Sequence, residues 1–215
     1  DDVTHLLVSA PPDDTGDPVL RWFTAQLEAL RHLAWAGYLS TTGVYGDKGG
    51  DWVDEETPLA PNTLRGERRM AAEQAWLKLA LPVHLFRLAG IYGPGRNQLL
   101  GVMNGTARRI IKQGQIFSRV HVEDIAGVLA ASIARPSPKR AYNVCDDEPC
   151  PPEDVVAYAA KILGLPLPPE IPFSEAGLSP LARSFYADSK RVSNTRIKAE
   201  LGYQLRYPNY RTGLA

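Results

Sequence analysis

The stretch GYLSTTGVYGDKGG, residues 37–50, passes from an apolar segment into three consecutive hydroxyl side chains and then into a glycine-rich turn. The apolar part predicts a short buried strand over 38–42, and a long polar loop follows it. Ser40, Thr41 and Thr42 can hydrogen-bond to the backbone of the turn, or they can line a ligand site at the end of the strand. The neighbouring segments help to decide between these two interpretations.

Strand and helix patterns alternate on both sides of this stretch. VTHLLVSAPP (3–12) predicts a first strand, and apolar residues at helical spacing predict a helix over 18–34. After the loop, the segment 62–80 is rich in Ala, Leu, Glu and Arg and predicts a second helix. PVHLFRLAGIYG (82–93) then predicts a third buried strand. Three such repeats are typical of a parallel sheet flanked by helices.

The second half of the chain lacks this regular alternation. Its patterns predict helices over 98–112, 123–134, 152–163 and 189–200, short strands over 116–122 and 141–145, and a proline-rich irregular excursion over 164–182. We therefore expect a mixed lobe that packs on the first half.

The composition excludes several classes of protein. Lys and Arg number 24 and Asp and Glu number 24, which gives no net charge and no indication of a nucleic-acid surface. No apolar run is long enough for a membrane helix and the first residues lack a secretion signal, so we expect a cytoplasmic protein without a membrane partner. Cys145 and Cys150 lack a second ligand pair at metal-binding spacing, so we expect two reduced thiols and no metal.

Three predicted strands end in small or polar residues, in the segments SAPP (9–12), STTG (40–43) and LAGIYGPGR (88–96). In an open parallel sheet, ligands bind in the crevice outside the carboxyl ends of the strands. We therefore expect the hydroxyls to lie at a ligand cleft. The G-x-G-x-x-G fingerprint of a dinucleotide site does not occur in the first strand–helix unit.

Five segments occur in an order and spacing that resemble a known superfamily. They are YLSTTGVYG, DEETPLAPNTLRGERRMAAE, FRLAGIYGPGR, FSRVHVEDIAGVLAASI and AYNVCDDEPCP. Together they resemble the extended and atypical short-chain dehydrogenase/reductases, the NAD-dependent epimerase/dehydratase superfamily, and most of all an uncharacterised epimerase-like branch.

The resemblance implies an α/β fold, with a Rossmann-type doubly wound parallel sheet and a small mixed α/β substrate lobe. Residues 1–97 would form the C-terminal half of an NAD(P)-binding domain. Residues 98–215 would form the substrate lobe, interleaved with the last sheet elements. By this mapping the chain opens at the fourth strand of the family, so we expect the β-α-β units with the glycine-rich turn to lie outside these residues.

The resemblance also implies a catalytic site. Thr41 falls on the family's catalytic Ser/Thr position, whereas Arg65 and Arg69 fall on its Tyr-x-x-x-Lys pair. An arginine stays protonated, so Arg65 could only stabilise negative charge, while Arg69 could still orient a ribose or phosphate. Alternatively, both arginines belong to a solvated helix face. Tyr45 and Tyr92 are then the candidate proton donors, or else aromatic members of a pocket wall.

Further contacts follow from the same resemblance. The residues expected to contact NAD or NADP are Ser9, Ala10, Pro11, Thr41, Arg69, Ala89, Gly90, Ile91 and Tyr92. Those expected to contact a small-molecule substrate are Thr42, Gly43, Tyr45, Tyr92, Arg96 and Arg119. We also expect Arg87 to pair with a buried carboxylate, Asp124 to cap or brace the following helix, and His121 to be structural.

Two functions are compatible with these residues. The first is an NAD(P)-dependent epimerase, dehydratase or reductase acting on a small sugar-like or nucleotide-linked metabolite. The second is a non-catalytic NAD(P)-binding regulatory or scaffold protein that has lost the Tyr-x-x-x-Lys pair. A homodimer through the helix over 62–80 is expected by analogy with the family.

Overall fold

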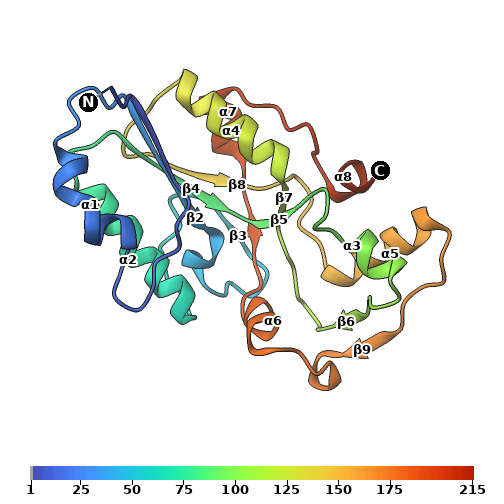
Figure 1. Cartoon of the computed structure of the whole chain (residues 1–215). Coiled ribbons are helices and arrows are strands. Elements are labelled where there is room, and N and C mark those ends of the chain that lie inside the picture. The colour runs from blue at the N-terminus through green and yellow to red at the C-terminus, as the bar shows by residue number, and fades with distance from the viewer. Residues whose placement is uncertain (1) are drawn as a thin grey trace.

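A four-stranded parallel sheet forms the centre of the computed structural model, which describes residues 2–215. The strand order is β1-β2-β4-β8, and Figure 1 shows these strands side by side. Their bounds are β1 His5–Val8, β2 Trp35–Thr41, β4 Val83–Leu88 and β8 Ala141–Val144. All six residues of β4 are buried, as expected for a strand covered on both faces.

Helices cover both faces of this sheet. The helices α1 (Pro18–Glu28) and α2 (Leu64–Lys78) pack on one face, where Tyr38, Trp76 and Leu85 belong to one buried cluster. The helices α4 (Val122–Ala134) and α7 (Thr195–Leu201) pack on the other face. Figure 1 shows the two pairs on opposite sides of the strands. The predicted doubly wound α/β fold is confirmed.

Local sequence fixes the starts of α1 and α2. Asp17 caps α1, because its Oδ1 accepts hydrogen bonds from the amides of Val19 and Leu20. Asp17 Oδ2 also accepts a hydrogen bond from Trp76 Nε1 at 3.1 Å, which ties α1 to α2. Thr63 caps α2 by accepting from the Gly66 amide at 3.1 Å. Two capped helices are thereby held together over one face of the sheet.

The rest of the chain forms a lobe at one side of the sheet, at the lower right in Figure 1. Its helices are α3 Gln98–Met103, α5 Pro152–Leu163, α6 Pro180–Phe185 and α8 Tyr210–Leu214. Its strand pairs are β5 Gly90–Tyr92 with β7 Arg119–His121, and β6 Arg109–Ile111 with β9 Glu170–Pro172. Two 3-10 turns, η1 Thr42–Tyr45 and η2 Phe173–Glu175, and the pair β3 Trp52–Val53 with β10 Arg191–Val192 complete the fold.

The expected bounds of two helices were wrong, and one segment expected to be irregular contains short regular elements. The helix predicted over 98–112 ends at Met103, because Gly105 adopts a left-handed φ of 67° and redirects the chain into β6. The helix predicted over 189–200 begins only at Thr195, since the preceding residues pair with β3. The excursion over 164–182 is packed against the lobe and contains β9 and η2.

None of the helices described over residues 2–215 combines the length and the apolarity that crossing a bilayer requires.

Candidate functional site

A cleft of about 990 Å³ lies where the strands β1, β2 and β4 end at their carboxyl sides. Residues 9, 39–43 and 88–92 line it from the sheet and the turns that follow, and the first turns of α2 line it from the side. Lobe residues between 96 and 192 close the opposite wall. The cleft therefore lies between the sheet and the lobe, as the strand ends predicted.

Thr41 ends β2 and lines this cleft together with its neighbours Ser40 and Thr42. Its Oγ1 accepts a hydrogen bond from the Gly43 amide at 3.2 Å and thereby caps η1. Within the described part of the chain, no acceptor takes the hydroxyl hydrogen of Thr41. Thr41 is therefore fixed by one lone pair and free to donate a hydrogen bond to a ligand oxygen.

Ser40, one residue earlier, belongs to a buried ionic network. Its Oγ donates to Glu73 Oε1 at 2.5 Å, and Glu73 forms an ion pair with Arg87 at 2.8 Å. Arg87 Nη1 donates to the Tyr45 hydroxyl at 2.9 Å, and that hydroxyl donates to Asn143 Oδ1 at 2.8 Å. The expected pairing of Arg87 with a carboxylate is confirmed. The network joins β2, α2, β4 and β8 directly behind Thr41.

The structure does not bring Tyr45 to the cleft, in contrast to our expectation of proton transfer and substrate contact. Its side chain is 0% exposed, and it is absent from the described cleft wall. Its hydroxyl uses its hydrogen for Asn143 and accepts from Arg87. Burial raises the pKa of Tyr45 to about 12. Because η1 turns this side chain towards Arg87, its role is structural.

Tyr92 lines the cleft, but its hydroxyl points away from it. The hydroxyl donates to the Asn209 carbonyl at 3.3 Å, and a Cβ atom built on Gly213 would lie 2.2 Å from that oxygen. The phenol thus reaches α8, and burial raises its pKa above the ordinary value. The ring packs edge-on against His121. Tyr92 is a wall residue, and the geometry does not support its expected role as a proton donor.

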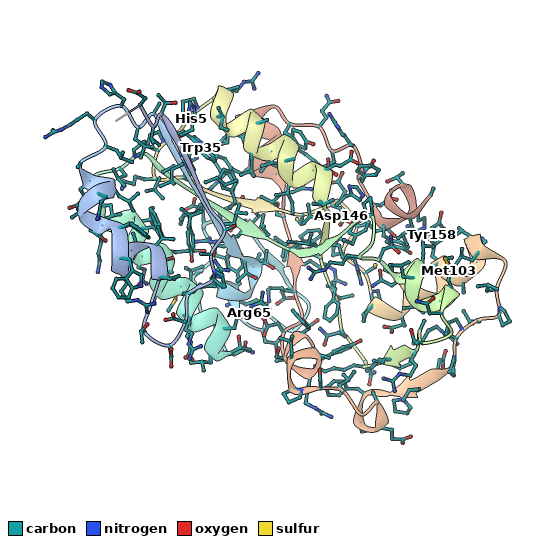
Figure 2. The ribbon with its side chains drawn as sticks, viewed as in Figure 1. His5, Trp35, Arg65, Met103, Asp146 and Tyr158 are labelled. Carbon is teal, nitrogen blue, oxygen red and sulfur yellow. The ribbon has the colours of Figure 1, made fainter. Side chains whose placement is uncertain are left out.

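Arg65 and Arg69 line the cleft from α2. Arg69 is 9% exposed, and its Nη1 donates to the Leu39 carbonyl at 2.7 Å and to the Tyr38 hydroxyl at 3.1 Å. Figure 2 shows Arg65 at the end of α2 that faces α6, where its guanidinium lies 5.8 Å from the Phe185 ring centroid. Burial, followed by the charges of Arg69 and Arg96, lowers the pKa of Arg65. The two side chains form a cationic wall of the cleft.

Gly66 lets α2 approach the Thr41 turn closely enough to place these arginines there. A Cβ atom at this position would lie 2.8 Å from the Gly43 carbonyl oxygen and 2.9 Å from Pro61 Cβ. Any larger residue would therefore push the first turn of α2 away from η1. In the sequence RGERR (65–69), the glycine between the arginines is therefore needed for α2 to pack against η1.

Most of the residues that the sequence pointed to meet in this cleft. Lining it are Ser9, Thr41, Thr42, Gly43, Arg65, Arg69, Ala89, Gly90, Ile91, Tyr92, Arg96 and Arg119. Ala10 and Pro11 are not part of its described wall, because β1 ends before them and only Ser9 reaches the cavity.

The expectations for residues 119–124 have mixed outcomes. Arg119 is buried, and its Nη1 donates to the Phe117 carbonyl and to Cys150 Sγ, both at 3.1 Å. His121 is structural, since its Nδ1 accepts from the Glu123 amide and caps α4. Asp124 does not cap α4. It accepts hydrogen bonds from the segment that follows α7, at the Tyr203 hydroxyl and at two backbone amides.

Sequence reasoning missed most lobe residues of the cleft. Among them are Arg108, Glu153, Tyr186 and Lys190. Glu153 begins the predicted helix α5, but its position in that helix gave no sign that it reaches the cleft, and the other three lie in short segments without a periodic pattern. Glu153 Oε2 is buried and has no hydrogen-bond partner in the described structure, and burial raises the pKa of this carboxyl. The sequence predicted only Arg96 and Arg119 for this wall.

Both cysteines are buried free thiols. Over residues 2–215, the structure contains no group of three or more His, Cys, Asp or Glu side chains that could hold a metal ion.

Comparison with curated proteins finds two informative relatives. Protein YeeZ of Escherichia coli (strain K12) is 34% identical over 179 residues, which make up 80% of this chain. A 3-diazoavenalumate denitrifying reductase of Streptomyces sp. is 27% identical over 183 residues, or 75% of this chain. The chain spans 58% of the length of each of these relatives. No protein-family model matches the chain.

Solved structures share the whole architecture. A conserved protein of unknown function from Silicibacter pomeroyi DSS has 61% sequence identity and a TM-score of 0.97, over 100% of this chain and 77% of that one. A candidate NAD-dependent epimerase/dehydratase from Methylobacillus flagellatus has 33% identity and a TM-score of 0.69, over 90% and 66%. The dTDP-glucose 4,6-dehydratase of Bacillus anthracis in complex with NAD shares the fold at 20% identity and a TM-score of 0.75, over 99% and 70%.

Proposed function

Since the chain belongs to the short-chain dehydrogenase/reductase superfamily, among the NAD-dependent epimerase/dehydratase-like proteins, we propose that it is an NAD(P)-dependent enzyme that acts on a small metabolite. The observation that carries this proposal is the Thr41 hydroxyl. It is positioned by η1, it is free to donate, and it faces a cleft at the carboxyl ends of a parallel sheet. A protein that only bound a nucleotide would not require this hydroxyl.

The residues around Thr41 fit the reactive half of a dinucleotide. Arg69 presents a buried guanidinium that is oriented by Leu39 and has no carboxylate partner among the described residues, so it can bind a ribose hydroxyl or a phosphate. Ser9 and residues 88–91 line the cleft as well, and Ala89 and Gly90 allow the backbone there to come close to a bound cofactor. The bound cofactor would supply or accept a hydride. A relative in fold, the Bacillus anthracis dehydratase, was solved with NAD.

In this proposal, Thr41 donates a hydrogen bond to the reacting oxygen of the substrate. Arg65 stays protonated, so it stabilises negative charge that develops on that oxygen without transferring a proton. The hydroxyls of Tyr45 and Tyr92 both point away from the cleft. We therefore favour a hydride transfer in which neither Tyr45 nor Tyr92 delivers the proton, and in which solvent water entering the open cleft supplies the proton that completes the reduction. The Streptomyces relative is named a reductase, which supports hydride transfer from the cofactor to the substrate.

The substrate expected from the superfamily is a small sugar-like or nucleotide-linked metabolite. The cationic cleft wall supports a substrate with negative charge. A non-catalytic role is less well supported, since capping of η1 uses only a lone pair of Thr41 Oγ1 and leaves the hydroxyl hydrogen unused.

The test begins with fluorescence titration of NADH and NADPH, followed by turnover assays on a panel of aldehydes, carboxylates and nucleotide sugars. Thr41→Val removes the hydroxyl and keeps the shape. We expect it to lower turnover about 10²-fold or more, as for loss of one oxyanion donor, with cofactor affinity nearly unchanged. Thr41→Ser should restore activity.

Thr24→Val is the matched control, because the Thr24 hydroxyl bonds only within α1. The proposal fails if neither cofactor binds, or if Thr41→Val turns over substrate as fast as Thr24→Val.

A further inference from the structure

Five arginines line the cleft, and none has a carboxylate partner among the described ion pairs; they are Arg65, Arg69, Arg96, Arg108 and Arg119. Three of them, Arg65 and Arg69 on α2 and Arg96 after β5, are electrostatically coupled, and we call them the arginine triad. Arginines elsewhere are commonly paired, for example Arg21 with Asp13 at 3.1 Å and Arg87 with Glu73 at 2.8 Å. The absence of counter-charge at the triad is therefore not a general property of the chain.

The triad members approach one cavity from two directions. Arg65 and Arg69 lie one turn apart on α2, so their side chains share a helix face. Arg96 comes from the turn after β5, where its backbone is paired with Gly93 at 3.0 and 3.1 Å. After burial, the positive charges of Arg69 and Arg96 both lower the pKa of Arg65. Two secondary-structure elements thus hold positive groups around one space.

Arg65 and Arg96 are exposed, so water screens the repulsion between them, whereas Arg69 is largely removed from water and is the member on which like charges act most strongly. An anion that lies between the arginines attracts each of them, and this attraction outweighs the repulsion among the arginines. A guanidinium is suited to this task, because its planar set of N–H donors matches the oxygens of a carboxylate or a phosphate.

We propose, building on the function above, that two members of the arginine triad, Arg65 and Arg96, bind an oxyanion of the substrate, a carboxylate or a phosphate, next to Thr41. Arg69, which donates to the Leu39 carbonyl, stays with the cofactor. The position that would carry a proton-transferring tyrosine, Arg65, then serves to anchor the substrate. Exposed apolar side chains at the same rim, Leu64 and Phe185, would contact an apolar part of the molecule. The substrate is therefore an acid with an apolar body, an aryl or alkyl carboxylate or phosphate.

Isothermal titration calorimetry with benzoate, inorganic phosphate and uridine diphosphate tests this proposal on the purified protein. We expect at least one of these anions to bind at one site, and Arg65→Gln and Arg96→Gln to weaken it at least tenfold. Arg65→Lys should retain part of the affinity, since it keeps the charge and loses the planar fork. Arg21→Gln removes an arginine charge far from the cleft and should change affinity by less than twofold. Thermal unfolding shows whether each variant is folded.

Repeating the titration with saturating NADH separates substrate from cofactor. Anion binding that persists with NADH bound supports the proposal, and preference for benzoate or for the phosphates identifies the oxyanion. The proposal is overturned if none of the anions binds, if folded Arg65→Gln and Arg96→Gln bind them as the wild type does, or if NADH displaces the anion and Arg65→Gln weakens NADH tenfold. Anion binding is first measured without cofactor. Loss of anion binding therefore counts against the arginine site, whereas failure of NADH or NADPH to bind counts against the proposed function.

Discussion

Replacement of Glu73 by glutamine should destabilise the protein severely while leaving its surface unchanged. Glu73 is 1% exposed and accepts hydrogen bonds from Ser40 Oγ at 2.5 Å and from Arg87 Nη2 at 2.8 Å. The neutral amide would leave the Arg87 charge buried without compensation. Removing one partner of such a pair costs about 3–5 kcal/mol, a large part of the roughly 5–15 kcal/mol that stabilises a typical domain.

Urea unfolding followed by circular dichroism measures this loss. With a slope of about 2 kcal/mol per molar urea, a 4 kcal/mol loss would move the midpoint by roughly 2 M. Glu67→Gln on the exposed side of the same helix should cost less than about 1 kcal/mol. The combined replacement Glu73→Leu with Arg87→Met should recover much of the loss, because it removes both charges. A Glu73→Gln variant that loses less than about 1 kcal/mol would refute the view that Glu73 compensates Arg87.

Three further outcomes are expected. Tyr45→Phe should cost about 1–3 kcal/mol in urea unfolding, because Arg87 and Asn143 each lose a hydrogen bond, yet leave NADH affinity unchanged; the opposite pattern would contradict its structural role. Burial raises the pKa of Asp146 from 3.8 to about 7, so its contribution to stability is complete below pH 4 and is lost as pH rises through 7. The free energy of unfolding of Asp146→Asn should therefore gain on that of the wild type between pH 5 and 8.5, by up to roughly 3 kcal/mol, and a constant difference would disprove this. Gly66→Ala should weaken both stability and NADH binding, since its Cβ meets the Gly43 carbonyl; wild-type values for both would show that α2 can shift freely.

The alternation of strands and helices could be predicted because it depends on local patterns. Buried strands of β-branched and aromatic residues separate helices with clear caps, and the order β1-β2-β4 follows from them. Arg87 could be predicted as paired, since a charge inside an apolar strand requires a partner. Thr41 could be placed at the cleft because parallel strands end at the same edge.

The remaining parts of the site depend on contacts between distant segments. Tyr45 follows Thr41 closely in sequence, but the η1 turn directs it inwards to Arg87. Glu153 and Lys190 reach the cleft only because α5 and β10 fold back over it. The end of α3 depends on one glycine conformation, which an apolar period does not reveal. Such features arise from tertiary packing and leave no regular pattern in the chain.

The neighbouring hydroxyls of β2 have a consequence for how this protein can change during evolution. Ser40 is held by Glu73 in the interior, whereas Thr41 faces the ligand side. Substitutions at Ser40 would be selected against through folding yield, and substitutions at Thr41 through activity. A lineage could therefore alter its chemistry at Thr41 while retaining the scaffold, and sequence variation at these adjacent positions would report two separate selective pressures.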